Sequence, residues 1–293
     1  MQKLILDTDI GSDIDDVMCL SYLLAQPECD LLGVTTVSGE PWKRAEIADA
    51  LCKRAGKDVP VFPGIEQPLL GKQFQPHAPQ HSKVGNWAHR NFPPGNAGKA
   101  IEFLRDTIRA NPGEVTLLTI GPLTNIAALF SIDREIPSML KELVMMGGCF
   151  TRDTAHTPLA EWNILCDPHA AQIVIGSPIP RLRMVGIDMT ARVVMERDEV
   201  KRRCTAPLLE TAVDFAEVWF EHSGSITFHD PLASAVIFEP DICPFARGYA
   251  DVELQSERLA GVTHWAAAED GPHEVASSVD VGRFFEHYFG VFD

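Results

Sequence analysis

The chain has 293 residues, a formal net charge of −16 and an apolar fraction of 45%. That apolar fraction is ordinary for a globular protein with a sizeable core, whereas the excess of acid argues against a basic face for nucleic acid or an anionic membrane. No segment reaches the roughly 18 uninterrupted apolar residues of a membrane span, and no apolar signal segment follows Met1. The seven cysteines form no CxxC pair, so neither a zinc site nor a disulfide framework is expected. We therefore expect a cytoplasmic protein with a small-molecule partner.

The first twenty residues hold a dense acidic loop between two apolar runs. Residues 4–6 predict a buried strand, and residues 17–20 predict the apolar face of a helix. Between them lie five aspartates in ten residues: Asp7, Asp9, Asp13, Asp15 and Asp16. Such a loop at the carboxyl end of a strand lies where open α/β sheets bind ligands. Unpaired carboxylates this close raise one another's pKa, and a hard divalent cation such as calcium is the simplest remedy. A solvated cluster at a helix start is the alternative.

Strands and helices alternate along most of the chain. Strands are predicted at 31–37, 59–62, 115–120, 143–146 and 183–187, and helices at 44–56, 98–111, 126–130, from 168 onward, 196–204, 207–221 and 229–238. This order predicts right-handed βαβ crossovers, so the fold class is α/β, with an open, mainly parallel sheet and helices on both faces. Small strands at 249–254, 261–266 and 277–280 precede a C-terminal helix. No linker or repeat interrupts the pattern, and residues 1–293 are expected to form a single domain.

The segment from Gln67 to Pro94 breaks this alternation. It holds His77, His81, Trp87 and His89 with little periodicity. Loops of this length in a compact domain are usually functional or act as lids. Its histidines are therefore candidates for substrate contact, with plain surface positions as the simpler expectation.

The other strand ends bring more polar residues to the edge of the sheet that carries the acidic loop. The turns there supply Glu40, 120–125, 146–148, 161–163 and the pair His229-Asp230. Together they predict an acidic, oxygen-rich pocket with Trp162 and Phe228 nearby. No GxxxxGK or GxGxxG phosphate loop and no GxSxG elbow is present. Because this much negative charge repels phosphate, a neutral polyhydroxylated ligand suits the pocket better.

Five segments in this order resemble the calcium-dependent nucleoside hydrolases of the inosine–uridine-preferring family. They are DTDIGSDIDD from residue 7, TIGPLTN, MMGG, PLAEWN with a DP pair shortly after it, and HDPLA, which ends near residue 235. The resemblance implies a nucleoside hydrolase-like fold with a Rossmann-like core and hydrolysis of the N-glycosidic bond of a ribonucleoside or related N-riboside. It also implies Ca²⁺ as cofactor, a role in purine or pyrimidine salvage, and a homo-oligomer, either a dimer or a tetramer.

The resemblance also implies roles for single residues. Asp9 matches the aspartate that acts as general base toward a calcium-bound water, and His229 matches a histidine linked to leaving-group protonation in some members. The implied metal ligands are Asp9, Asp16, Asp230 and the backbone carbonyl of Ile120. Asp15 matches the acceptor of the ribose 2′-hydroxyl. The full set of substrate-binding residues expected here is Asp13, Asp15, Glu40, Met146, Glu161, Trp162 and Asn163.

The sequence departs from the family pattern at several places. Five residues, IGSDI, separate Asp9 from the aspartate pair where the family has three, so either Asp13 replaces Asp15 against the sugar or the loop bulges. Glu40 stands where many members have asparagine, Ala155 stands where an asparagine often helps bind the 5′-hydroxyl, and the loop near His81 lacks the usual HG. We therefore expect the chemistry at the anomeric carbon to be retained. The sequence leaves the identity of the base open, and the candidate substrates include a modified nucleoside.

Two alternatives from other classes remain at the level of the sequence. The Asp7-Thr8-Asp9 segment after a strand is similar to the nucleophile loop of haloacid-dehalogenase-type phosphatases, but the acids that follow fit poorly and HDPLA stays unexplained. The acidic spacing is also similar to the loops of non-catalytic calcium- or sugar-binding proteins, which usually lie between helices rather than after a strand. Hydrolysis of an N-riboside explains more of the chain than either.

Overall fold

A nine-stranded sheet runs through the described part of the chain, in the order β10-β9-β11-β6-β5-β4-β1-β2-β3. The computed structural model describes residues 1–151 and 157–293. Its strands are β1 (Gln2–Thr8), β2 (Cys29–Thr36), β3 (Val61–Pro63), β4 (Val115–Thr119), β5 (Glu142–Met146), β6 (Leu182–Val185), β9 (Phe245–Val252), β10 (Thr263–Ala267) and β11 (His273–Ala276). Strand β9 pairs antiparallel with β10 and β11, and every other described pair in this sheet is parallel.

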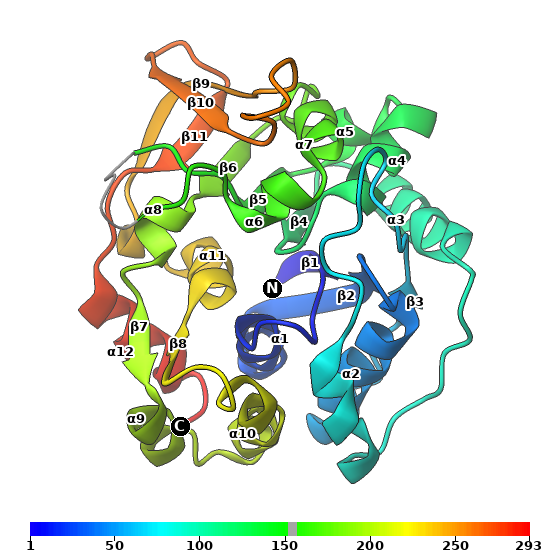
Figure 1. Ribbon diagram of the computed structural model, residues 1–293, viewed down its shortest axis with the longest axis vertical. Helices are drawn as coiled ribbons and strands as arrows, with labels where there is room; N and C mark the ends of the chain where they lie inside the picture. Colours follow the sequence, from blue (N-terminus) through cyan, green and yellow to red (C-terminus); the bar gives the residue numbers. More distant parts are fainter. Residues whose placement is uncertain (152–156) are drawn as a thin grey trace.

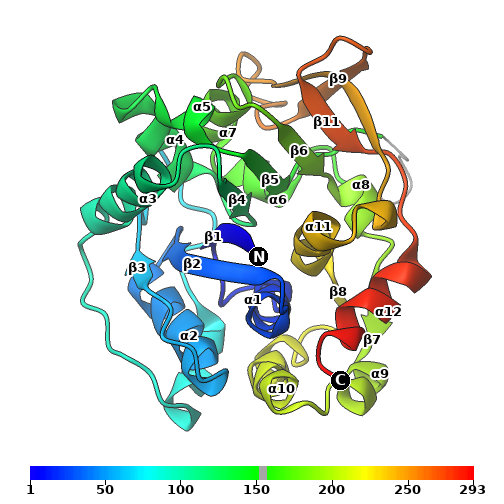
Figure 2. The ribbon, with the colours of Figure 1, turned by 180° about the vertical axis from the view of Figure 1, so that it is seen from behind.

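Helices cover both faces of the sheet (Figures 1 and 2). One face carries α1 (Asp15–Ala25), α2 (Pro41–Arg54), α10 (Pro207–Trp219), α11 (His229–Phe238) and α12 (Val281–Gly290). The other carries α3 (Gly98–Ala110), α4 (Thr124–Ile132), α5 (Ile136–Met139) and α7 (Pro168–Ile175). Shorter elements are α6 (Trp162–Cys166), α8 (Ile187–Thr190), α9 (Arg197–Arg203), the 3₁₀ helices η1 (Pro79–Asn86) and η2 (Pro240–Ile242), and the two-stranded antiparallel pair β7 (Val194–Glu196) and β8 (Ser225–Thr227).

The central strands are buried on both sides, which explains their continuous apolar sequences. In β1, Leu4 and Leu6 pack into the core under α1 and α11, whereas Ile5 packs into the core under α3 and α4. In β5, Val144 joins the first core and Met145 the second. Alternation of period two on a strand covered by helices on both faces is the expected packing of a parallel sheet. The predicted α/β class with a mainly parallel sheet and helices on both faces is confirmed.

Some predicted elements are wrong at their ends. The strand expected over 183–187 ends at Val185, and Asp188 lies inside α8, where its carboxylate accepts hydrogen bonds from the backbone N–H groups of Phe150 and Thr151. The last strand is β11 at His273–Ala276 rather than 277–280, because its pairing with β6 ends at Val275 and its pairing with β9 ends at Ala276. The segment 222–228, which lies between two predicted helices and was given no strand, contains β8. No helix among the described residues is long and apolar enough to cross a membrane.

Candidate functional site

A cavity of about 460 Å³ opens where β1, β4 and β5 end. The predicted site residues that line it are Asp9, Asp13, Asp15, Asp16, Ile120, Met146, Glu161, Trp162, Asn163, His229 and Asp230. Residues from the first, middle and last thirds of the chain meet here because parallel strands share one carboxyl edge. The prediction that these turns converge therefore agrees with the geometry, while the role of each residue stays a prediction.

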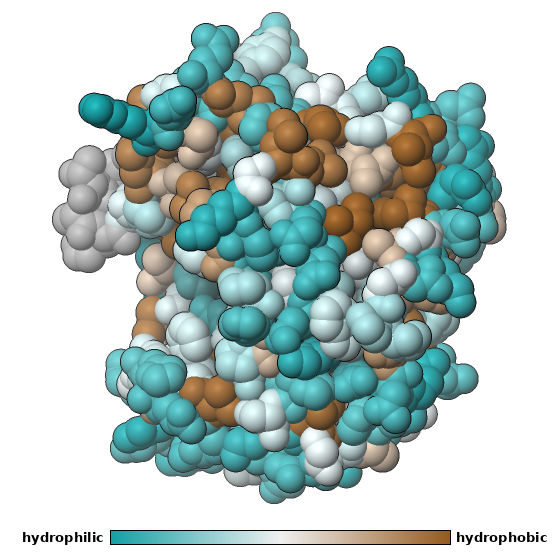
Figure 3. Space-filling view, turned by 45° about the vertical axis from the view of Figure 1, so that its right-hand side comes forward, coloured by the Kyte–Doolittle hydropathy of each residue, from teal (hydrophilic) through white to brown (hydrophobic). Residues whose placement is uncertain are grey.

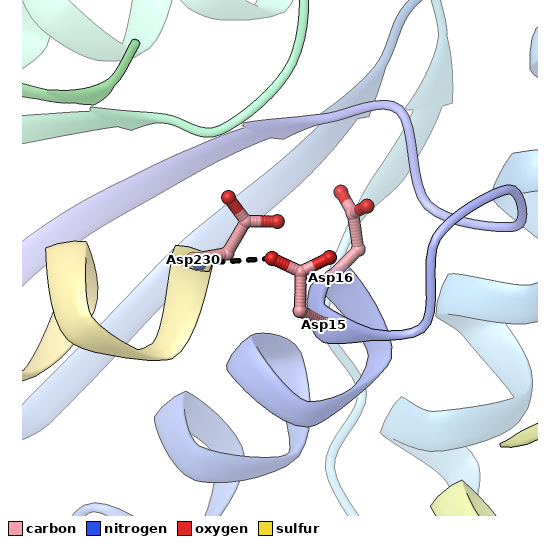
Figure 4. A group of neighbouring side chains, drawn as sticks. All are labelled: Asp15, Asp16 and Asp230. Carbon is pink, nitrogen blue, oxygen red and sulfur yellow. Dashed lines mark hydrogen bonds between the residues drawn. The ribbon is translucent and has the colours of Figure 1, made fainter. Parts of the chain in front are cut away.

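Three buried carboxylates form the centre of the cavity. Asp15 and Asp16 lie in the first turn of α1, Asp230 lies in the first turn of α11, and one oxygen of each lies within 4.8 Å of the others. Figure 4 shows the three side chains directed toward one another, with the backbone N–H of Asp230 donating to Asp15 Oδ2 at 3.0 Å. Both helix N-termini favour negative charge at this point. Burial nevertheless raises the pKa of all three carboxyls, and each is raised further by its acidic neighbours.

Asp9 lies beside this cluster, at the end of β1. Its Oδ2 accepts a hydrogen bond from Gln75 Nε2 at 2.5 Å. Burial raises the pKa of the Asp9 carboxyl, and the charge of Arg44 opposes that rise. The turn after β4 passes so close that a Cβ at Gly121 would lie 2.7 Å from Asp9 Oδ1. The glycine of the TIGPLTN segment is thus required by the close approach of the backbone to Asp9.

Arg44 is a fully buried cation that holds the acidic loop through backbone oxygens. Its Nη1 donates to the carbonyls of Asp9 and Ile10 and to Ser12 Oγ, its Nε donates to Gly39 O at 2.7 Å, and its Nη2 donates to His77 O at 3.0 Å. A planar guanidinium can satisfy several oxygens at once in this way. Arg44 therefore joins the lengthened acidic loop to the 67–94 loop and places a positive charge behind Asp9 and Asp16.

Asp7 faces away from the cavity and ties β1 to its neighbours. Its Oδ2 accepts from Thr35 Oγ1 at 2.5 Å and from Asn125 Nδ2 at 2.7 Å, and Asn125 also donates to Thr36 O. Burial raises the pKa of Asp7 to about 7, although both hydrogen bonds lower it. Asp7 therefore connects β1 with β2 and α4 through hydrogen bonds, at the start of the acidic loop.

Glu161 and Asn163 form the wall next to β5. The Glu161 carboxylate caps α6 by accepting from the N–H groups of Asn163 and Ile164, and it also accepts from Gly148 N at 3.1 Å. Burial raises its pKa to about 7. Asn163 Nδ2 donates to Ile120 O at 2.9 Å and to Met146 O at 3.3 Å. These contacts fix the oxygens that face the cavity before any ligand arrives.

His229 lines the cavity together with Ile187 and Trp219. Its Nδ1 lies 2.6 Å from Thr190 Oγ1. Burial lowers the pKa of His229 to about 4, so its imidazole is neutral at neutral pH. Phe228, expected near the pocket, instead packs its ring against Phe284, Phe285 and Tyr288 of the α12 region, with centroids 5.3–6.0 Å away. That expectation for Phe228 is wrong, because the apolar C-terminal helix covers its ring.

Glu40 is the predicted site residue that does not line the cavity. Its carboxylate accepts from Lys43 Nζ at 2.6 Å and from the backbone N–H of Ala78 at 3.0 Å.

Asp13 does line the cavity. Its Oδ1 accepts a hydrogen bond from Ile14 N at 2.6 Å, and burial raises the pKa of its carboxyl to about 6. His77 reaches the cavity rim, whereas His81 contacts Glu46 at 2.5 Å. Ala155 lies outside the described residues.

The sequence reasoning missed Arg44, Gln75 and Trp219 as parts of this site. Arg44 carried a signal, because it follows the same helical periodicity as the buried Ile47 and Leu51, a position where an arginine needs partners. Gln75 carried none, because it lies in an irregular loop. Trp219 ends α10, and only the packing of α10 brings it to the cavity.

The fold and the site are those of a nucleoside hydrolase, and comparison with known proteins places the chain in one family. Residues 4–286 match the family described as inosine-uridine preferring nucleoside hydrolase, and the chain belongs to that family. Uridine nucleosidase 1 of Arabidopsis thaliana is 32% identical, covering 98% of this chain and 91% of the relative. The pyrimidine-specific ribonucleoside hydrolase RihB of Escherichia coli O9:H4 (strain HS) is 31% identical, covering 89% and 86%.

Solved structures agree with this assignment. The plant nucleoside hydrolase PpNRh1 has a TM-score of 0.85 at 25% identity, covering 99% of this chain and 98% of that one. A purine-preferring ribonucleoside hydrolase from Gardnerella vaginalis has a TM-score of 0.82 at 27% identity, with the same coverage. The protein is therefore an enzyme that hydrolyses the N-glycosidic bond of ribonucleosides. These matches set aside the phosphatase and the non-catalytic binding protein.

Proposed function

We propose that this nucleoside hydrolase works with a calcium ion held by Asp9, Asp16, Asp230 and the carbonyl of Ile120. The observation that carries the proposal is the buried cluster of Asp15, Asp16 and Asp230, one oxygen of each lying within 4.8 Å of the others. Asp16 and Asp230 are the two members of this cluster that are proposed as ligands, and Asp9 lines the same cavity. The donor set fits a hard cation, because it consists of oxygens alone and burial raises the pKa of its three carboxyls, Asp9, Asp16 and Asp230. A calcium ion there supplies a Lewis acid that eases the loss of a proton from water.

Asp9 is the proposed general base. It faces the cavity from the end of β1, and the hydrogen bond from Gln75 engages only one of its two oxygens. A carboxylate in that place can accept the proton of the attacking water. Rupture of the glycosidic bond gives the ribose oxocarbenium character, and the surrounding carboxylates stabilise that positive charge.

The ribose hydroxyls are proposed to bind between the acidic loop and α6. Asp15 accepts from the 2′-hydroxyl, and Asp13, which lines the same cavity, is the alternative acceptor. Glu161, Asn163 and Met146 hold the remaining hydroxyls, supported by the contacts that fix the Glu161 and Asn163 side chains in advance. Trp162 covers the sugar from the rim. Preformed contacts of this kind orient the reacting bond.

The nucleobase is proposed to lie toward His229. The neutral imidazole can donate one hydrogen bond to a departing base, with Thr190 on its other nitrogen. The relatives are named for uridine, for pyrimidine ribonucleosides and for purine ribonucleosides, so both base classes belong in the substrate test, together with modified bases. A role in purine or pyrimidine salvage follows if free bases are released.

The decisive experiment is a nucleoside panel assayed for free ribose with calcium and with a chelator. We expect release that depends on calcium, and its loss in Asp9→Ala by at least about 10³-fold. The Asp9→Ala protein must keep its circular dichroism spectrum, which separates loss of the base from loss of the fold. Unchanged ribose release by Asp9→Ala would refute the assignment of Asp9 as general base. Ribose release that is the same with and without the chelator would refute the requirement for calcium.

Two wider proposals concern the domain organisation and the location of the protein. Residues 1–293 form a single domain, since one sheet takes β1 from the start of the chain and β11 from near its end. The buried free thiols favour the reducing cytoplasm, and they are Cys19, Cys29, Cys52, Cys166, Cys204 and Cys243. A fractionation experiment tests that location.

The protein is also proposed to form a homo-oligomer, a dimer or a tetramer, as the family resemblance implies. Large apolar side chains are exposed, among them Leu69, Leu70, Phe74 and Leu159. Figure 3 shows apolar residues gathered in the upper part of one face, above a largely hydrophilic lower part. Grouped apolar surface of this kind fits association with a second copy. Light scattering of the purified protein measures the number of subunits, and a monomer would contradict the proposal.

A further inference from the structure

Gln75 lies in the cavity although it belongs to the irregular 67–94 loop. Its side chain is buried, with 9% of the residue exposed, and it lines the cavity beside Asp9 and Trp162. Its Nε2 donates to Asp9 Oδ2 at 2.5 Å, and its Oε1 accepts from Trp162 Nε1 at 2.7 Å. One amide therefore connects the residue proposed as the general base with an aromatic ring on the rim.

The indole fixes which way the amide points. An indole N–H is a donor only, so the atom of Gln75 that faces Trp162 must be the oxygen. The amide nitrogen is then the atom that faces Asp9, and it donates to the carboxylate rather than competing with it. A donor on Oδ2 leaves Oδ1 as the oxygen of Asp9 that the amide does not engage.

The backbone around Gln75 is held at several points. Gln73 Oε1 accepts from the N–H of Gln75 at 2.8 Å, and Arg44 Nη2 donates to the carbonyl of His77 at 3.0 Å. The turn after β2 comes so near that a Cβ at Gly39 would lie 2.4 Å from the carbonyl oxygen of Gln75. The amide is thus presented from a segment with little freedom to withdraw.

We propose that Gln75 is a positioning residue that holds the Asp9 carboxylate for proton transfer, and that Trp162 sets the orientation of the amide. The inference rests on the proposed role of Asp9 as base. Proton transfer depends on the direction of the accepting oxygen, and a shift of about 1 Å can cost about 100-fold in rate. The 67–94 loop then contributes to catalysis through Asp9, in addition to forming part of the cavity wall.

The experiment compares the kcat and KM of Gln75→Ala, Trp162→Phe and the double variant on the best nucleoside of the panel. Trp162→Phe removes the indole N–H and keeps an aromatic ring against Phe74, whose centroid lies 6.5 Å from that of Trp162. We expect Gln75→Ala to lower kcat by about 10–100-fold and to change KM by less than about 3-fold. Because the indole acts on kcat through the amide, the loss of kcat in the double variant should equal that of Gln75→Ala alone.

Three further variants make the outcome unambiguous. Gln75→Glu keeps the length of the side chain but places an acceptor against Asp9, so its kcat should fall below that of Gln75→Ala. Gln67→Ala, the same change at an exposed position of the same loop, should keep wild-type kcat. Asp9→Ala supplies the reference: full activity there would refute the proposed base, whereas an inactive Asp9→Ala beside a fully active Gln75→Ala would refute only the positioning role.

Calcium binding gives a readout that is independent of turnover. Calorimetry with calcium alone should show an affinity within about 3-fold of wild type for Gln75→Ala, since the amide is not a proposed ligand. Loss of kcat that merely follows loss of calcium would overturn the positioning role. So would a rise in KM at constant kcat, which marks a substrate contact.

Discussion

The acidic loop of residues 7–16 and the 67–94 loop both bring side chains to one cavity, but different contacts hold them. The carboxylates of the acidic loop come from the end of β1 and the first turn of α1, so the sheet and a helix fix their positions. Gln75 precedes η1 in the other loop, and side-chain contacts with Asp9, Trp162 and Gln73 hold it. The first segment is placed by regular structure, and the second by a few hydrogen bonds. Changes in the first should therefore remove function, and changes in the second should reduce it.

The largest effect is expected where the acidic loop meets α11. Asp230→Asn keeps the shape of the side chain but removes one of the three clustered charges. We expect ribose release to fall by at least about 10³-fold, and the rise in melting temperature on adding calcium to disappear. Ribose assays and thermal melting with and without calcium measure both. An active Asp230→Asn protein that calcium still stabilises would show that Asp230 is not a ligand.

Substitution of Arg44 removes hydrogen bonds that hold both the acidic loop and the 67–94 loop. Arg44→Met leaves carbonyl oxygens of Gly39, Ile10 and His77 without their buried donor. Several unsatisfied buried acceptors should lower the free energy of unfolding by about 3–5 kcal/mol. Urea unfolding measures this loss. Arg44→Lys keeps the charge but cannot reach the same set of oxygens, so an intermediate loss is expected, and equal stability of Arg44→Met and wild type would contradict the account.

The contrast between the two loops also explains what the sequence could predict. The acidic loop, the turn at Ile120 and the pair His229-Asp230 lie next to regular elements, so periodicity and strand order bring them to one edge. The position of Gln75 depends on an irregular path that only tertiary contacts define, and no pattern in the sequence encodes it. The ends of strands were also predicted poorly, because they too depend on tertiary contacts. Asp188 was expected at the end of a strand, but it lies in α8, where its carboxylate accepts hydrogen bonds from the backbone N–H groups of Phe150 and Thr151.

The pH dependence of stability should report on the buried carboxyls around the cavity and at the end of β1. Burial raises the pKa of Asp7 and Glu161 to about 7, so the folded state keeps protons that the unfolded state has lost. The unfolding free energy of the calcium-free protein should therefore fall as the pH rises from about 6.5 to 8. His229, whose pKa is lowered from 6.5 to about 4, acts in the opposite direction near the lower end of that window, but it is one group against two carboxyls.

Calcium should remove the part of this dependence that comes from its proposed ligands Asp9, Asp16 and Asp230, whose pKa values burial also raises, because a bound cation takes the place of their protons. Melting temperatures at pH 6.5 and 8, each with calcium and with a chelator, measure the difference. The stabilisation by calcium should be larger at pH 8 than at pH 6.5. A calcium-free protein that melts higher at pH 8 than at pH 6.5 would contradict the buried, proton-retaining state of these carboxyls.

The smallest effect is expected at Glu40, which stands between the two loops without reaching the cavity. Its carboxylate accepts from the N–H of Ala78 in the 67–94 loop and from the half-exposed Lys43. Glu40→Gln keeps an acceptor for Ala78 and loses a surface ion pair, which contributes less than about 1 kcal/mol. We expect kcat and KM to change by less than about 3-fold. A large rise in KM would instead place Glu40 in contact with the substrate, as its alignment with the family's asparagine implies, and would mean that the turn after β2 moves toward the cavity when a nucleoside binds.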